Sequence, residues 1–208
     1  MLLNLYNLFR REMNQATVLG YFLQALPIAC IAGIAYFAIR IVILKRSYAR
    51  IKWKQEILRV IFFCYLTGLI SLVILPANFW LHFYDGIFFG WWDEMGQVFR
   101  FGGVNLVPSV IKCLAGELSL GSWVKTMLIG NIAMFFPLGF FLPLITRVRS
   151  GKKIVLAAIA VPICFEMIQP FLGRSFDVDD LICNFIGIIT GAIVARIVLK
   201  EKSSDIQE

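Results

Sequence analysis

Five long apolar segments constrain the fold of this chain more than any other feature. Each is close to the ~20 residues that a helix needs to cross a bilayer, and the apolar residues run continuously instead of alternating. With 60% hydrophobic and only 16% charged residues, the composition fits no class of soluble protein. The sequence therefore predicts an all-α fold, a polytopic integral membrane helical bundle. The predicted spans are Val18–Leu44, Ile57–Leu75, Thr126–Ile145, Ile154 to about Phe171, and about Leu181–Leu199.

Two segments outside the spans carry signals of their own. Residues 1–15 are too short to span and lack a cleavage-site pattern, so they predict an interfacial amphipathic segment. Residues 79–101 hold ten of the thirty aromatic residues, which predicts an outer loop in the headgroup zone; a lipid-binding surface there is an open alternative. A short amphipathic helix is predicted around Ser109–Leu118. The chain thus divides into 1–77 with two spans, 78–199 with the aromatic loop and three spans, and a tail at 200–208.

The net charge of +7 gathers at the ends of the apolar segments. Fourteen of the 20 Lys and Arg residues lie in Arg40–Arg59, Arg147–Lys153 and Arg196–Lys202, each beside a span. Since basic loops remain in the cytoplasm, this predicts an N-terminus outside and a cytoplasmic C-terminus. Arg10 and Arg11 oppose that orientation but are outnumbered. The pattern indicates membrane lipid as a partner and no nucleic acid.

The cysteines and the single histidine show no spacing typical of a metal or nucleophile site. The five cysteines are scattered without a CxxC pair, which is typical of small apolar packing residues. His82 lies in the aromatic segment just beyond a span, where an interfacial position suits it better than a role as ligand or base. We therefore predict no metal site and no cofactor.

The stretch Phe165–Gly191 concentrates polar residues between two apolar runs. At ~1.5 Å of helical rise per residue from the basic ends, Glu166 lies about 18 Å into its span. Gln169, Asn131 and Asn184 lie about 22 Å in by the same count, within a hydrocarbon core of ~30 Å. Three different helices thus place polar groups in one layer, which favours a common pocket.

Spacing on the last span supports that layer. Asp177, Asp180, Asn184, Gly187 and Gly191 recur at intervals of three and four, so they share one helix face. The carboxylates and the amide occupy its outer end. The two glycines form a small-residue seam that allows another helix to approach closely.

Four acids near this layer, Glu166, Asp177, Asp179 and Asp180, accompany one local base, Arg174. Mutual neutralisation would leave unpaired charge near low dielectric, so we expect a cationic or hydroxyl-rich ligand. A divalent metal fits less well, because the adjacent Asp179 and Asp180 point in different directions. Glu166 is either protonated or paired with Arg174. Alternatively, all these groups bond to one another and only lock the helices together.

Several motifs follow one another in a fixed order: Asn105-Leu106-Val107-Pro108, Asn131 with Pro137-Leu138-Gly139, Glu166-x-x-Gln169, Arg174-Ser-Phe-Asp177-Val-Asp179-Asp180 and Asn184-x-x-Gly187-x-x-x-Gly191. The ordered set resembles the VanZ family over roughly Asn105 to Ala195, with the first two spans outside the well-matched part. Pro162 departs from the pattern, because a small polar residue is expected a turn before the glutamate. Proline cannot supply a hydroxyl group at this position.

The resemblance implies a bacterial cytoplasmic-membrane protein of the cell envelope. The founding member is associated with low-level resistance to the glycopeptide teicoplanin, and many relatives are encoded outside resistance clusters. We expect an outward-facing polar pocket for a lipid-linked cell-wall precursor, another glycan-bearing envelope molecule or a glycopeptide. The candidate ligand-binding residues are Asn105, Asn131, Glu166, Gln169, Arg174, Asp177, Asp179, Asp180 and Asn184.

Two rival functions remain open at this point. The first is a membrane enzyme that modifies such a lipid, with Glu166 or Asp180 as acid or base and Arg174 steadying the transferred group. The second is a small transporter, which the sequence disfavours because the inner halves of the spans hold almost no polar residues.

Overall fold

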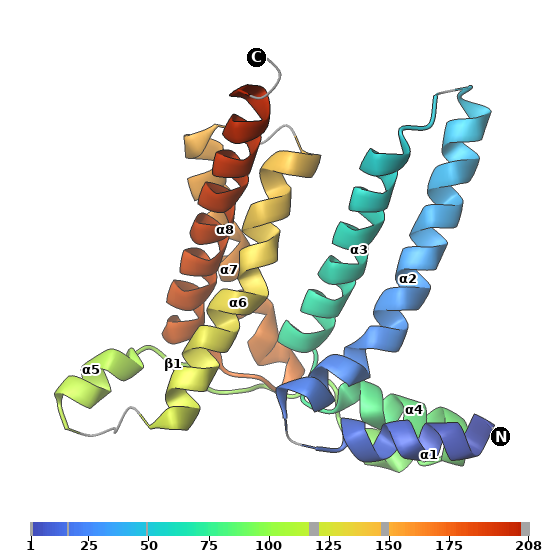
Figure 1. Ribbon diagram of the computed structural model, residues 1–208. Helices are drawn as coiled ribbons and strands as arrows, with labels where there is room; N and C mark the ends of the chain where they lie inside the picture. The colour runs from blue at the N-terminus through green and yellow to red at the C-terminus, as the bar shows by residue number, and fades with distance from the viewer. Residues whose placement is uncertain (1, 16, 49, 117–120, 147–149, 205–208) are drawn as a thin grey trace. The chain divides into compact units, whose positions relative to one another are not determined.

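The computed structural model describes residues 2–15, 17–48, 50–116, 121–146 and 150–204. These residues form eight α-helices, two short 3₁₀ helices and one pair of two-residue strands. The all-α fold is therefore confirmed (Figure 1).

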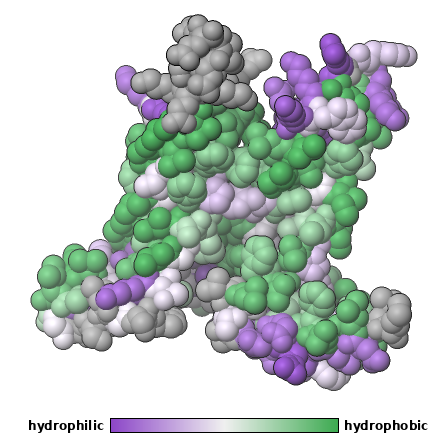
Figure 2. All heavy atoms as spheres, in the orientation of Figure 1, coloured by the Kyte–Doolittle hydropathy of each residue, from purple (hydrophilic) through white to green (hydrophobic). Residues whose placement is uncertain are grey.

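Five helices are long and apolar enough to cross a membrane, as predicted, so the chain is a multi-pass membrane protein. Much of their surface is apolar, and hydrophilic side chains gather at helix ends, as at the α2–α3 turn (Figure 2). Lipid tails are as apolar as these side chains, so such a surface needs no protein cover. The five helices are α2 (Val18–Arg46), α3 (Trp53–Val73), α6 (Ser122–Ile145), α7 (Gly151–Ile168) and α8 (Val178–Ser204).

Several helix boundaries differ from the predicted ones, and three of them have a clear local cause. α3 begins four residues earlier than Ile57, because the turn from Trp53 carries Glu56 into a buried ion pair. α7 ends at Ile168 and continues as the 3₁₀ helix η2 (Gln169–Leu172), since Pro170 has no N–H to donate. α8 begins at Val178, ahead of the predicted Leu181, because polar first-turn residues extend it.

The chain divides into two compact units. The first comprises Met1–Phe101 together with Phe171–Arg174. The second comprises Gly102–Pro170 together with Ser175–Glu208. Neither unit is continuous in sequence, because the short segment Phe171–Arg174, which interrupts the second unit, belongs to the first.

In the first unit, the helices α1 (Leu2–Met13) and α4 (Phe79–Phe89) meet through a buried carboxylate. Asp85 accepts a hydrogen bond from the Tyr6 hydroxyl at 2.6 Å and one from Arg10 Nε at 2.7 Å. Burial, reinforced by the bond to Asp85, raises the pKa of Tyr6 well above its ordinary value. The phenol therefore keeps its proton and acts as a donor. The predicted N-terminal amphipathic segment is thus a helix anchored to the aromatic segment.

The aromatic segment is ordered by ring contacts. The rings of Tyr6 and Phe88 stack at 4.2 Å between centroids. Trp92, in the 3₁₀ helix η1 (Trp92–Met95), lies so close to Gly86 that a Cβ there would stand 2.5 Å from the indole. The segment is therefore a folded helix and turn, and its placement at lipid headgroups stays a prediction.

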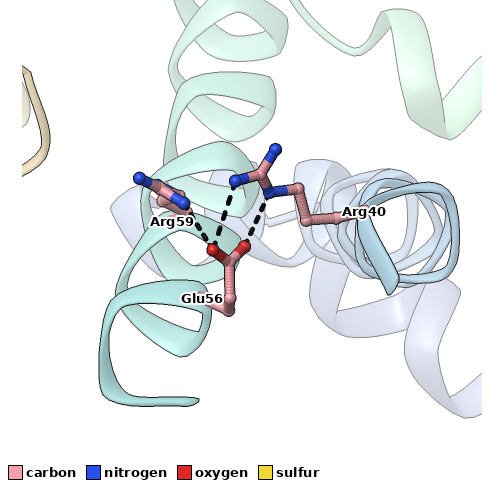
Figure 3. Close-up of polar contacts among 3 residues, drawn as sticks. All are labelled: Arg40, Glu56 and Arg59. Carbon is pink, nitrogen blue, oxygen red and sulfur yellow. Dashed lines mark hydrogen bonds and ion pairs between the residues drawn. The ribbon is translucent and has the colours of Figure 1, made fainter. Parts of the chain in front are cut away.

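α2 and α3 form a hairpin joined at one end by an ion-pair network (Figure 3). Glu56, whose side chain is 4% exposed, accepts from Arg40 Nε at 2.8 Å and Nη2 at 3.3 Å. Its carboxylate also bonds to Arg59, one turn along α3. One acid thus neutralises part of the charge of two arginines at the basic end of the hairpin.

Replacing Glu56 with alanine is expected to lower the free energy of unfolding by about 2 kcal/mol. This is less than the ~3–5 kcal/mol for breaking a fully enclosed pair, since each arginine keeps about 30% exposure and its charge stays hydrated. Thermal unfolding in detergent measures the change. Glu12→Ala, which breaks the exposed Arg11–Glu12 pair, is the control and should cost at most ~0.5 kcal/mol. Equal losses in both variants would contradict the network.

In the second unit, α6 and α8 approach each other backbone to backbone through glycines. A Cβ at Gly139 would lie 1.9 Å from the carbonyl oxygen of Ile188. In the other direction, a Cβ at Gly191 would lie 2.0 Å from the carbonyl oxygen of Phe136. One at Gly187 would also clash with α6 backbone. The predicted small-residue seam on the last span is therefore confirmed.

The predicted short helix after Pro108 exists as α5 (Ser109–Leu114). It ends before the predicted Leu118, because Gly116 has a φ of +76°, which does not continue a right-handed helix. Residues 117–120 lie outside the described residues. At the opposite end of this unit, Arg196 of α8 approaches Gly151 of α7. Lys152 and Lys153 follow Gly151 directly, and the orientation expected from these basic segments stays a prediction.

Candidate functional site

A small parallel strand pair brings the Asn105 motif to the start of α8. β1 (Val104–Asn105) pairs with β2 (Phe176–Asp177), with Asn105 opposite Asp177. Flanking backbone bonds extend the pairing, from Gly102 N–H to the Pro170 carbonyl at 2.8 Å and from Phe176 N–H to the Gly103 carbonyl at 2.9 Å. Two motifs about seventy residues apart in the chain are therefore held side by side.

Asp177 is the centre of this arrangement. Its Oδ2 accepts from Asn105 Nδ2 at 3.0 Å, and its Oδ1 accepts from the Asp179 N–H at 2.9 Å. The second bond caps the first turn of α8, where N–H groups lack helical partners. The backbone N–H of Asp177 donates to Glu166 Oε2 of α7 at 2.9 Å. Asp177 thus ties α7, α8 and β1 together.

Asp179 and Asp180 point to different elements, as predicted. Both carboxylate oxygens of Asp179 accept from the Ser109 N–H, at 3.1 and 2.9 Å, and so cap the start of α5. Asp180 accepts from Asn131 Nδ2 on α6. The two carboxylates therefore bond to different helices, α5 and α6. Both also lie in the first turn of α8, where the helix dipole favours negative charge.

The residues predicted to share a layer are largely enclosed. Glu166, Gln169 and Asn184 are 0%, 1% and 2% exposed, and Asn131 is half-buried. Among the described residues, no hydrogen-bond donor reaches the buried Oδ1 of Asn184. A buried acceptor without a donor is unusual, because native proteins leave few of them. The layer therefore contains an acceptor that these contacts leave unsatisfied.

Lys112 joins the cluster although the sequence interpretation did not select it. Its Nζ donates to Asn105 Oδ1 at 2.9 Å, from one turn inside α5. The sequence feature that could have identified Lys112 is its place in the predicted amphipathic helix, three residues after Ser109. Lys112 therefore brings a positive charge beside Asp177 through the Asn105 amide.

Arg174 donates hydrogen bonds to backbone carbonyls within the first unit. Its Nη1 donates to the carbonyl oxygens of Leu72 at 3.0 Å and Leu75 at 3.3 Å, at the end of α3. Both belong to the first unit, as Arg174 does. Arginine at a helix C-terminus satisfies carbonyls that lack helical partners. Its role as the group that binds a phosphate or carboxylate of the ligand stays a prediction.

The VanZ/LLP1 family profile matches residues 62–199. The chain belongs to the VanZ/LLP1 family. The match covers about two thirds of the chain and includes all nine candidate residues. It also reaches into α3, so the VanZ/LLP1 domain extends further toward the N-terminus than the resemblance from Asn105 indicated. No curated protein and no solved structure matches the chain.

Proposed function

We propose that this VanZ/LLP1 protein binds a lipid-linked or glycan-bearing molecule of the cell envelope at the polar cluster of its second unit. Supporting this is the buried Oδ1 of Asn184, which accepts no hydrogen bond among the described residues. A hydroxyl or ammonium group of a bound molecule would satisfy it. The neighbouring bonds to Asp177 and Asp179 all come from amide or backbone N–H groups.

The chemistry of the cluster favours a ligand rich in donors. Carboxylates accept hydrogen bonds strongly from hydroxyl and amine groups. Asn131, Gln169 and Asn184 would orient such a ligand, while Glu166 and Asp180 would take its hydrogens. Lys112 adds one cation able to attract a phosphate. A lipid-linked sugar phosphate carries both kinds of group on a chain that partitions into the bilayer, and a glycopeptide such as teicoplanin carries sugar hydroxyls and an amine.

The orientation proposed for this function has the N-terminus outside, the C-terminus in the cytoplasm and the cluster in the outer half of a bacterial cytoplasmic membrane. The basic residues at the ends of α2 and α7 support it, because positive charge stays on the cytoplasmic side. The cluster lies at the start of α8, at the other end of that helix from Arg196.

Purified protein in detergent is expected to bind undecaprenyl-phosphate-type lipids or teicoplanin saturably, and Asn184→Leu should weaken that binding at least ~10-fold. Leucine has a similar volume but offers no acceptor. Thr190→Val, on an exposed face of the same helix, is the matched control and should bind normally. Fluorescence or calorimetric titration gives both affinities.

Absence of saturable binding to these lipids and to teicoplanin would contradict the proposal, as would an Asn184→Leu variant that binds like the wild type. A membrane enzyme acting on the same lipid predicts a different pattern. Glu166→Gln and Asp180→Asn would then abolish cellular function while binding persists.

A further inference from the structure

Three ionisable side chains of the first unit, none of which belongs to the polar cluster of the second unit, converge on one another. His82 and Asp85 are three residues apart on α4, which places them on one helix face. Glu94 comes from η1, which follows α4 after a short turn. One imidazole nitrogen and one oxygen of each carboxylate all lie within 4.8 Å of one another.

Two polar atoms of these residues are buried and have no hydrogen-bond partner among the described residues. Asp85 is 0% exposed, and while its Oδ1 accepts from Tyr6 and Arg10, its Oδ2 has no hydrogen-bond partner among the described residues. Nδ1 of His82 is likewise buried and has no hydrogen-bond partner among the described residues. It stands 3.7 Å from Glu94 Oε2, too far for a hydrogen bond. Buried polar atoms left in this state cost free energy, so a bound group between them would stabilise the arrangement.

The charges around these atoms also favour a cation. Asp85 and Glu94 are two carboxylates, and the guanidinium of Arg10 offsets one of them. Arg10 itself is held over the ring of Trp91 at 5.2 Å, so it stays beside Asp85 Oδ1 and not Oδ2. With a neutral imidazole, one negative charge stays uncompensated beside the free Oδ2.

We propose that His82, Asp85 and Glu94 bind a divalent transition-metal ion. One imidazole with two carboxylates suits Zn²⁺ or Mn²⁺, whereas Mg²⁺ and Ca²⁺ take oxygen ligands. Ligand atoms ~2.1 Å from a shared ion lie ~3–3.5 Å apart, close to the 3.7 Å between His82 Nδ1 and Glu94 Oε2. One carboxylate oxygen of Asp85 lies within 4.8 Å of the imidazole and of the Glu94 carboxylate, so a small inward shift completes the site.

The surroundings of Asp85 match those of a ligating carboxylate. Tyr6 and Arg10 both bond to Oδ1, which fixes the carboxylate and leaves Oδ2 available to an ion. Metal ligands commonly have such supporting hydrogen bonds. Glu94 is about half exposed, so an ion reaches it without crossing the packed interior, and water completes the coordination. Binding would also join α1 to α4 and η1 through these shared contacts.

The test uses full-length protein purified without a histidine tag and treated with a chelator. Titration with Co²⁺, followed by its visible absorption, is expected to saturate at one ion per chain, and Zn²⁺ should displace it. His82→Ala and Glu94→Gln should each weaken binding at least ~10-fold. Asp93→Asn, the exposed acid beside Glu94, is the matched control and should bind as the wild type does. Mg²⁺ should not compete.

A second measurement does not depend on how any variant folds. His82 is the only histidine, so a histidine-labelled sample gives one set of imidazole NMR signals, which Zn²⁺ should shift. Binding that persists in His82→Ala, or no saturable binding of Co²⁺, Zn²⁺ or Mn²⁺, would overturn the proposal. So would imidazole signals of the wild-type protein that respond to pH but not to Zn²⁺, because His82 would then bind a proton and no metal ion.

Discussion

Gly191→Ala is expected to lower the free energy of unfolding by ~3 kcal/mol or more. The new methyl group would lie 2.0 Å from the Phe136 carbonyl oxygen and 2.8 Å from the Phe140 backbone nitrogen. Overpacking usually costs ~1–3 kcal/mol, when side chains can rearrange. Here the obstructing atoms are helix backbone, so α6 and α8 must move apart along their whole contact. The midpoint of thermal unfolding in detergent gives the loss.

Gly130→Ala provides the matched control for this experiment. Gly130 lies on α6 as well, but a Cβ there has no atom within 4 Å. The same substitution should therefore leave stability unchanged or raise it by up to ~1 kcal/mol through helix propensity. If Gly191→Ala and Gly130→Ala unfold at the same temperature, the close approach of α6 and α8 is wrong.

Glu166→Ala is expected to loosen the start of α8 and to cost ~1–3 kcal/mol, with a further loss from the cavity. Glu166 is fully buried, and its Oε2 accepts the N–H of Asp177, the residue that pairs with Asn105. Without this acceptor, the Asp177 N–H loses its hydrogen bond, and β2 loses this bond to α7. Glu166→Gln keeps an oxygen in place and should retain most of the stability.

Hydrogen exchange localises this effect as well as measuring it. Amides from Phe176 to Asp179 should exchange faster in Glu166→Ala, whereas those in the middle of α6 should not. Cys164→Ala, an exposed position two residues earlier on α7, is the control and should leave the exchange unchanged. Unaltered exchange at Asp177 in Glu166→Ala would show that this bond does not hold the segment.

The sequence predicted those parts of the fold that depend on composition and on regular spacing. The apolar runs identified all five long helices, and intervals of three and four placed Asp180, Asn184, Gly187 and Gly191 on one face of α8. Asp177, predicted on the same helix face, lies instead in β2, just before the helix begins at Val178, because it pairs with Asn105 of β1. Helix ends were predicted less well, because they depend on particular partners. The start of α3, for example, follows Glu56, whose ion pair with Arg40 joins separate helices.

Only part of the candidate site was predicted, because some of its bonds also depend on particular partners. Asn131 belongs to the polar layer that depth along the helices predicted, and Asp180, to which it bonds, belongs to the helix face that spacing predicted. The bonds from Ser109 to Asp179 and from Lys112 to Asn105 depend on how a loop returns, which no local pattern encodes. Arg174 donates to the backbone carbonyl of Leu72. Because every residue has a backbone carbonyl, the sequence could not predict which one accepts this bond. His82 was discounted because no second histidine accompanies it, although nearby carboxylates can take that place.

The contact of Arg174 with the end of α3 also bears on the order in which the protein is made. The carbonyls of Leu72 and Leu75 are synthesised about a hundred residues before the guanidinium that bonds to them. During that interval α4, α6 and α7 emerge from the ribosome while the end of α3 has no Arg174 donor. The first unit therefore reaches its final set of contacts only after most of the second has been translated. A chain truncated before Arg174 would contain α1 to α4 complete and still lack this donor.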